Sequence, residues 1–204
     1  MSGVRSMVGA LSGLALSSAL VFLPSAPSLA DTGDQPDATQ LVAGLAASPD
    51  TEAAFAALTP AEQAVVLEAA QVDHVTTTSD EAEQAAQARA MAVAGCYNYT
   101  ARSAFYNSFG QTLGTMWTTG QICYNGSKVT SAKFVDGGGA TQFIGWSYAG
   151  RTSASAAVSG GGGYAYGAYT FRFALVAGFQ EPIYCARVVG TSVAGHGDTR
   201  CGIG

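Results

Sequence analysis

The residues that most often carry catalysis are scarce in the second half of this sequence. His196 is the only histidine after residue 95, and Asp198 follows it in the stretch Gly195-His196-Gly197-Asp198. A histidine and a carboxylate so close together among glycines are typical of a solvated turn, because a catalytic base also needs a nucleophile and an orienting group. His74 lies at the end of a predicted helix, where the helix dipole favours a positive charge. Neither histidine is expected to act in catalysis.

Carboxylates and nucleophiles are equally scarce there. A glycosidase needs two carboxylates across the scissile bond, and this half offers only Asp136, Glu181 and Asp198, each next to a turn residue. No G-x-S-x-G sequence marks a serine nucleophile. The four glycines at 160–163 precede a predicted strand rather than a helix, so they favour a hairpin loop over a phosphate-binding loop. We predict no catalytic site and no cofactor.

The four cysteines are predicted to form two disulfides. They form an even set in the last part of the chain, as Cys96, Cys123, Cys185 and Cys201. A zinc site is not expected, because there is no C-x-x-C pair and only two histidines could assist. Four cysteines allow three pairings. We predict Cys96–Cys123 and Cys185–Cys201, since each pair joins sequence neighbours that flank predicted strand pairs.

The first thirty residues have the three parts of a secretory signal peptide. Arg5 is the only charged residue among them, an apolar stretch covers residues 11–23, and two prolines follow. Ser28-Leu29-Ala30 places small side chains at the positions that a signal peptidase accepts. A transmembrane anchor is less compatible, because serines interrupt the apolar stretch and a span needs roughly 20 apolar residues. We predict cleavage after Ala30, no stable membrane insertion, and a secreted, extracellular protein.

The rest of the chain divides into two regions of different composition. Residues 31–95 carry eleven acidic side chains against one basic side chain, a net charge of −10, whereas residues 96–204 carry three against seven, a net charge of +4. Eighteen of the twenty aromatic residues lie in 96–204. A net charge of +4 is too small to indicate nucleic-acid binding. The opposite charges favour an intramolecular contact between the two regions.

Residues 31–95 are predicted to be helical. Thr59-Pro60-Ala61-Glu62 is a capping box with proline at the first helical position, and similar signals occur at Ser48-Pro49-Asp50 and at Thr78-Ser79-Asp80-Glu81. The apolar residues of this region suffice for a helical hairpin but are few for an independent core. The region is interpreted either as an acidic spacer that keeps the chain soluble or as a pro-segment that docks on the basic region.

Residues 96–204 alternate between apolar and polar side chains as an antiparallel β protein does. The odd-numbered residues of 97–105 share one face of a first strand, and those of 165–175 share one face of the longest strand. Asn125-Gly126 predicts a tight hairpin, because both residues tolerate a positive φ. The glycines at 137–139 and at 160–163 predict further turns. Seven or eight strands in this length predict a mainly β fold, an antiparallel β-sandwich or a small barrel.

Two short motifs of this region are Cys123-Tyr124-Asn125-Gly126 before Val129-Thr130, and Trp146-Ser147-Tyr148-Ala149-Gly150 before a glycine turn. These motifs resemble those of a set of small secreted actinobacterial proteins whose activity is uncharacterised. The resemblance covers about the last half of the chain. It implies export and a β fold, and it implies no activity.

Aromatic residues are the strongest candidates for a binding surface. The region 96–204 has only ten charged side chains, so uncharged residues must cover much of its surface, and tyrosine supplies contact area at low entropic cost. The candidate binding residues are Trp117, Trp146, Tyr164 and Tyr166. The alternative is that these residues are half-buried strand positions selected for β propensity.

The function predicted from the sequence is a non-enzymatic secreted β domain that binds an extracellular protein or a cell-envelope glycan. Two alternatives stay open. The protein could be an exported toxin or antimicrobial that its acidic segment keeps inactive. It could also be a secreted proteinase inhibitor that presents the loop 185–201, with Arg200 as its specificity residue.

Overall fold

The computed structural model describes residues 37–78, 94–176 and 179–203 of the chain. The predicted signal peptide at 1–30 and the helix predicted to follow Thr78 lie outside these ranges. In the first described range the backbone forms three helices, α1 (Ala38–Ala47), α2 (Thr51–Ala56) and α3 (Pro60–Ala69).

A side chain caps the beginning of each helix. Asp37 and Asp50 accept hydrogen bonds from backbone amides in the first turns of α1 and α2. Thr59 and Glu62 form the predicted capping box of α3, with Pro60 at the first helical position. These bonds satisfy amides that have no partner within the helix. The helical prediction is therefore confirmed as far as residue 69.

The chain after α3 forms a strand, and the prediction that His74 ends a helix is wrong. Strand β1 (His74–Thr78) pairs antiparallel with β2 (Gly95–Tyr106), so that His74 lies opposite Tyr106. The sequence His-Val-Thr-Thr-Thr is rich in β-branched residues, which favour an extended backbone. The region 31–95 thus contributes a strand to the β fold as well as helices.

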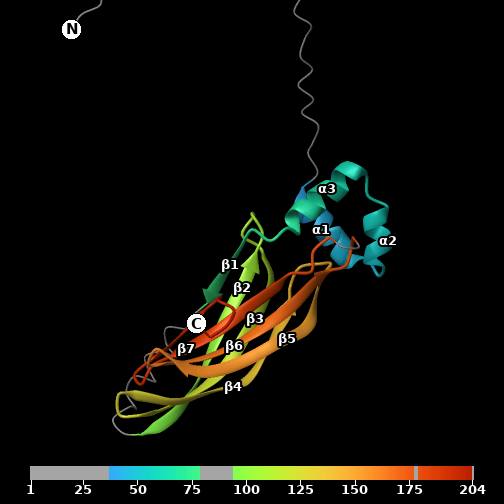
Figure 1. The fold of residues 1–204 in the computed structure, drawn as a ribbon. Helices are drawn as coiled ribbons and strands as arrows, with labels where there is room; N and C mark the ends of the chain where they lie inside the picture. Colours follow the sequence, from blue (N-terminus) through green and yellow to red (C-terminus); the bar gives the residue numbers. More distant parts are fainter. Residues whose placement is uncertain (1–36, 79–93, 177–178, 204) are drawn as a thin grey trace, which may run out of the picture. The chain divides into compact units, whose positions relative to one another are not determined.

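Two antiparallel four-stranded sheets form the rest of the fold (Figure 1). Sheet A has the strand order β1-β2-β3-β4, and sheet B has the order β5-β6-β7-β8. The remaining strands are β3 (Thr112–Asn125), β4 (Lys128–Thr141), β5 (Trp146–Ser159), β6 (Gly162–Phe173), β7 (Ile183–Gly190) and β8 (Gly195–Asp198). The mainly β prediction is confirmed as a sandwich of two sheets, not a closed barrel.

The predicted alternation sets which strand faces point into the sandwich. The odd-numbered residues of 99–105 on β2 and of 165–173 on β6 are buried, as expected. The hairpin between β3 and β4 is confirmed but shifted by one residue. Asn125 pairs with Lys128, so the turn residues are Gly126 and Ser127, and Gly126 has a φ of 57°.

The turn predicted at the glycines 137–139 is wrong, because these glycines lie inside β4. A Cβ atom on Gly137 would lie 1.9 Å from the hydroxyl oxygen of Tyr169, and one on Gly139 would lie 2.6 Å from the Phe171 ring. No side chain fits in either place. The glycines therefore make room for aromatic side chains between the sheets.

The main core lies between the sheets and includes the end of α3. Ala69 and Ala70 are fully buried in the same cluster as Phe105 and Phe171. The Asn107 side-chain amide donates a hydrogen bond to the Ala69 carbonyl oxygen at 2.7 Å. Apolar packing and hydrogen bonds to backbone groups thus join the helices to the sheets. Among the described residues, no ion pair links the two.

Both predicted disulfides are present. Cys96–Cys123 joins directly opposed residues of β2 and β3, and Cys185–Cys201 joins β7 to the segment after β8. Two disulfides are consistent with an oxidising, extracellular compartment. The Cys185–Cys201 bond also ties the C-terminal segment to sheet B.

Candidate binding site

The four aromatic residues singled out in the sequence do not gather in one place. Trp117 lies half-buried on the outer face of sheet A. Tyr164 and Tyr166 lie half-buried on the outer face of sheet B. Trp146 lies between the sheets and is only 5% exposed. The structure therefore offers two outer faces as separate candidate surfaces.

Trp146 is a core residue, and the expectation that it is exposed is wrong. The rings of Phe105 and Phe173 pack against its indole ring at centroid distances of 5.4 and 5.7 Å. Its indole N–H donates a hydrogen bond to the Ala70 carbonyl oxygen at 3.1 Å. Trp146 is the first residue of β5. A buried tryptophan needs a hydrogen-bond partner for its N–H group, and the Ala70 carbonyl oxygen is that partner.

Strand alternation places Trp117 on the outer face of sheet A. Its neighbours Met116 and Thr118 point into the sandwich and are at most 1% exposed. Gly138 lies opposite Trp117 on β4, and a Cβ atom there would lie 2.8 Å from the indole ring. The ring therefore rests directly on the β4 backbone. A side chain at residue 138 would displace it.

A groove of about 220 Å³ lies beside this ring. Its polar and aromatic lining includes Arg102 and Tyr106 from β2, Thr115 and Trp117 from β3, and Gln142 from the segment after β4. We call this site the Trp117 groove. Tyr106 is held on its other side by His74, whose ring stacks on it at 5.1 Å with 14° between the planes.

Arg102 is the charged group of the Trp117 groove. It lies directly opposite Trp117 in the β2–β3 ladder and is exposed. Within the described part of the chain its side chain makes no hydrogen bond or ion pair. An arginine offers five N–H donors in one plane. These donors are thus available to a bound molecule beside the exposed part of an indole ring.

Sequence reasoning singled out Trp117 but missed Arg102, Tyr106 and Gln142. The position of Arg102 could have been predicted from the Cys96–Cys123 disulfide. Cys96 lies directly opposite Cys123, and a count of six residues along each strand places Arg102 opposite Trp117. Gln142 carries no comparable signal, because its place depends on where β4 ends.

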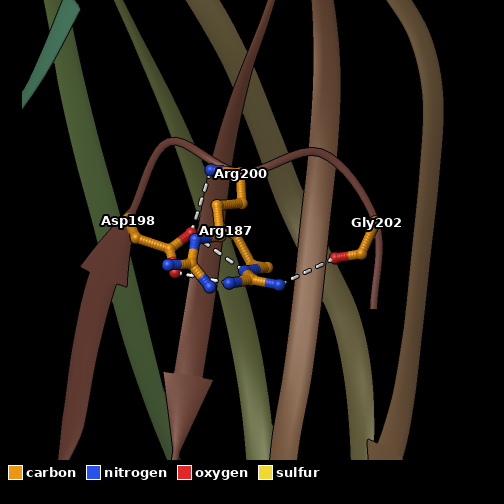
Figure 2. Close-up of polar contacts among 4 residues, drawn as sticks. All are labelled: Arg187, Asp198, Arg200 and Gly202. Atoms are coloured by element: carbon orange, nitrogen blue, oxygen red, sulfur yellow. Dashed lines mark hydrogen bonds and ion pairs between the residues drawn. The ribbon is translucent and has the colours of Figure 1, made fainter. Parts of the chain in front are cut away.

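The protein's own C-terminal segment covers the part of the outer face of sheet B around Arg187. Arg187 of β7 points to this face, yet it is only 3% exposed. Its guanidinium group donates hydrogen bonds to both Asp198 carboxylate oxygens, at 2.9 and 2.6 Å. A weaker bond of 3.4 Å goes to the Gly202 carbonyl oxygen, and Figure 2 shows Arg187 between these two acceptors.

Asp198 bonds to both Arg187 and Arg200. We call Arg187, Asp198, Arg200 and Gly202 the C-terminal cluster. The Arg200 backbone amide donates to the Asp198 carboxylate at 3.0 Å (Figure 2). Partial burial by itself would raise the pKa of Asp198, but the hydrogen bonds from Arg187 and Arg200 and their positive charges outweigh burial and lower it. The Asp198 carboxylate therefore has a structural role, as the partner of Arg187 in an ion pair.

These contacts determine what the remaining sheet B candidates can do. The Tyr164 ring lies 5.4 Å from the Arg187 guanidinium carbon in a cation–π contact, so Tyr164 is part of the cluster.

His196 is exposed on β8 opposite Val189, and Asp198 is bound to Arg187 rather than to His196. The stretch 195–198 is a strand, so the turn expected there is wrong. Arg200 is exposed beside the Cys185–Cys201 disulfide.

On the outer face of sheet A, by contrast, the Trp117 groove is open to solvent. In the described ranges, no three His, Cys, Asp or Glu side chains come together as a metal site. The helices in those ranges are too short or too polar to cross a membrane.

Comparison with known proteins finds no matching family model, curated protein or solved structure.

Proposed function

We propose that this protein is a secreted binding domain that holds a cell-envelope glycan in the Trp117 groove without transforming it. The observation that carries the proposal is the half-buried Trp117 ring, which rests on Gly138 beside Arg102, an exposed arginine whose side chain has no partner among the described residues. Export is supported by the signal-peptide pattern of the first thirty residues and by the two disulfides.

The groove has the groups that a sugar needs. An indole ring buries a large apolar area, and its flat face can pack against the C–H face of a pyranose. Thr115, Gln142 and Arg102 supply hydrogen-bond donors and acceptors at the rim. Small-ligand sites combine aromatic surface with a few polar groups that orient the ligand, and the Trp117 groove has both.

Removal of the ring tests the proposal. The secreted chain and its Trp117→Ala variant would be incubated with purified cell wall, and the bound fraction measured over a range of wall concentrations. We expect the substitution to weaken binding at least about tenfold, or ~1.4 kcal/mol, and Trp117→Phe to restore part of the affinity. Tyr166→Ser on sheet B is the matched control and should bind as the parent does.

The treatment of the wall distinguishes a glycan from a protein ligand. Binding that survives protease digestion of the wall but disappears after glycan hydrolysis supports the proposal. Equal binding by Trp117→Ala and the parent, with the thermal midpoint unchanged, would show that the groove is not the site. Binding that is lost on protease digestion would assign the groove to a protein partner.

A further inference from the structure

In the described part of the chain the sandwich has four edge strands, and three of them are protected against pairing with another strand. Proteins protect such edges with short strands, charges or bulges. β1 has five residues and β8 has four. β4 carries Lys128, Lys133 and Asp136, and irregularities in its pairing with β3 leave Thr130 and Val135 unpaired. β5 is the edge that remains.

The second half of β5 has none of these protections. Both irregularities in its pairing with β6 lie before Ser153, and residues 153–159 then pair with β6 in one unbroken register. This stretch, Ser-Ala-Ser-Ala-Ala-Val-Ser, contains no charge and no proline. Only β6 pairs with β5 in the described part of the chain. Among the described residues, the backbone donors and acceptors on the other side of this seven-residue stretch therefore have no strand partner.

The side chains of this stretch divide into two unlike faces. Ala154, Ala156 and Val158 lie on the inner face, where Ala156 packs against the buried cluster around Ile122. Ser153, Ser155, Ala157 and Ser159 lie on the outer face. Val158 is 41% exposed although it lies on the inner face. The apolar side chain of Val158 is thus exposed at the edge of the sandwich.

We propose that two copies of this chain pair through residues 153–159 of β5, antiparallel, about a two-fold axis at Ala156. This register places Ala154 opposite Val158 on the inner face and Ser155 opposite Ala157 on the outer face. Apolar residues then meet apolar residues on the side of the core, and no charge is buried. The two copies of sheet B become one continuous sheet, and each copy helps to cover the Val158 of the other.

The stretch fits a second copy because its pairing is self-complementary, as a two-fold interface requires. The side chains of the stretch are small on both faces, which favours close pairing of two β5 strands. This interface lies on sheet B, and the Trp117 groove lies on sheet A. The two proposals can therefore fail independently.

Sedimentation velocity of the secreted chain over a wide concentration range tests the pairing. We expect a monomer–dimer equilibrium. Ser155→Lys should weaken the dimer about tenfold, because the substitution occurs twice and places like charges near the axis. Thr76→Lys, at an exposed position on the opposite edge strand β1, is the matched control and should leave the equilibrium unchanged. A monomer at all concentrations up to the solubility limit, or a dimer that Ser155→Lys does not weaken, would overturn the proposal.

A cysteine placed on the axis tests the register. Ala156→Cys should form an intermolecular disulfide on mild oxidation, because opposed strand residues have Cα atoms about 4.5–5.5 Å apart, within disulfide range. Ala154→Cys should not, because its own copy lies four residues away, roughly 13 Å along the partner strand. Equal cross-linking of both variants, or of neither, on non-reducing gels would contradict pairing about Ala156.

Discussion

Replacement of Tyr169 by phenylalanine should measurably destabilise the fold through one lost hydrogen bond. The Tyr169 side chain is fully buried, and its hydroxyl group lies 2.7 Å from the hydroxyl oxygen of Thr118, which is also fully buried. Burial raises the pKa of Tyr169 to about 12, so the hydroxyl group is neutral at ordinary pH. Neither side chain is exposed to solvent.

The size of the effect follows from this geometry. Tyr169→Phe removes a hydrogen bond and leaves the Thr118 hydroxyl group buried without that partner, which costs about 1–3 kcal/mol. For a chain of this size we expect the thermal midpoint to fall by roughly 2–4 °C per kcal/mol. Chemical denaturation gives the free energy of unfolding directly. Tyr166→Phe, at a half-buried position on the outer face of sheet B, is the matched control and should change it by less than about 0.5 kcal/mol.

A double-mutant cycle makes the reasoning refutable. Thr118→Val should cost a similar amount to Tyr169→Phe, because it leaves the tyrosine hydroxyl group without its partner. The double variant should cost clearly less than the sum of the single changes, since no buried polar group is then left over. If the costs simply add, or if Tyr169→Phe is no more destabilising than Tyr166→Phe, the hydroxyl pair does not stabilise the core.

Two further predictions concern the glycines and the C-terminal cluster. Gly137→Ala should lower the free energy of unfolding by about 1–3 kcal/mol, because its methyl group would overlap the Tyr169 hydroxyl group. Gly44→Ala, in α1 with nothing within 4 Å of the new Cβ atom, should raise it by roughly 0.5–1 kcal/mol; the same sign for both in chemical denaturation would contradict the packing argument. Because the pKa of Asp198 is lowered in the folded protein, its pair with Arg187 should stabilise fully above about pH 4 and lose this effect as the pH falls through the lowered pKa. Asp198→Asn should therefore reduce stability near neutral pH and flatten its decline in acid, and an unchanged acid decline in denaturation experiments would contradict this.

The sequence predicts the fold class here because the information needed is local. Alternation along β2 and β6, the capping box at Thr59 and the tight turn near Gly126 each depend on a few neighbouring residues. The cysteine pairing followed from the same strand pairs. Local signals of this kind survive in the folded chain, because each is consistent with the packing around it.

The sequence misleads where distant packing decides. The glycines at 137–139 look like a turn, but they lie in a strand because Tyr169 and Phe171, on the other sheet, fill the space that side chains would occupy. Trp146 looks available for binding, but the core formed with β2 and β6 buries it. Arg187 carries no sequence signal of burial, since Asp198 and the C-terminal segment that cover it are positioned by β8 and the Cys185–Cys201 disulfide.

The most direct test of glycan binding in the Trp117 groove is an NMR titration of the two indole N–H signals with soluble cell-wall fragments. Trp117 and Trp146 are the two tryptophans of the chain, and Trp117→Phe assigns their signals. We predict that the Trp117 signal shifts in a saturable way, while that of Trp146, bonded to the Ala70 carbonyl oxygen, stays in place. If the Trp117 signal does not move while wall fragments demonstrably bind, the glycan does not occupy the groove.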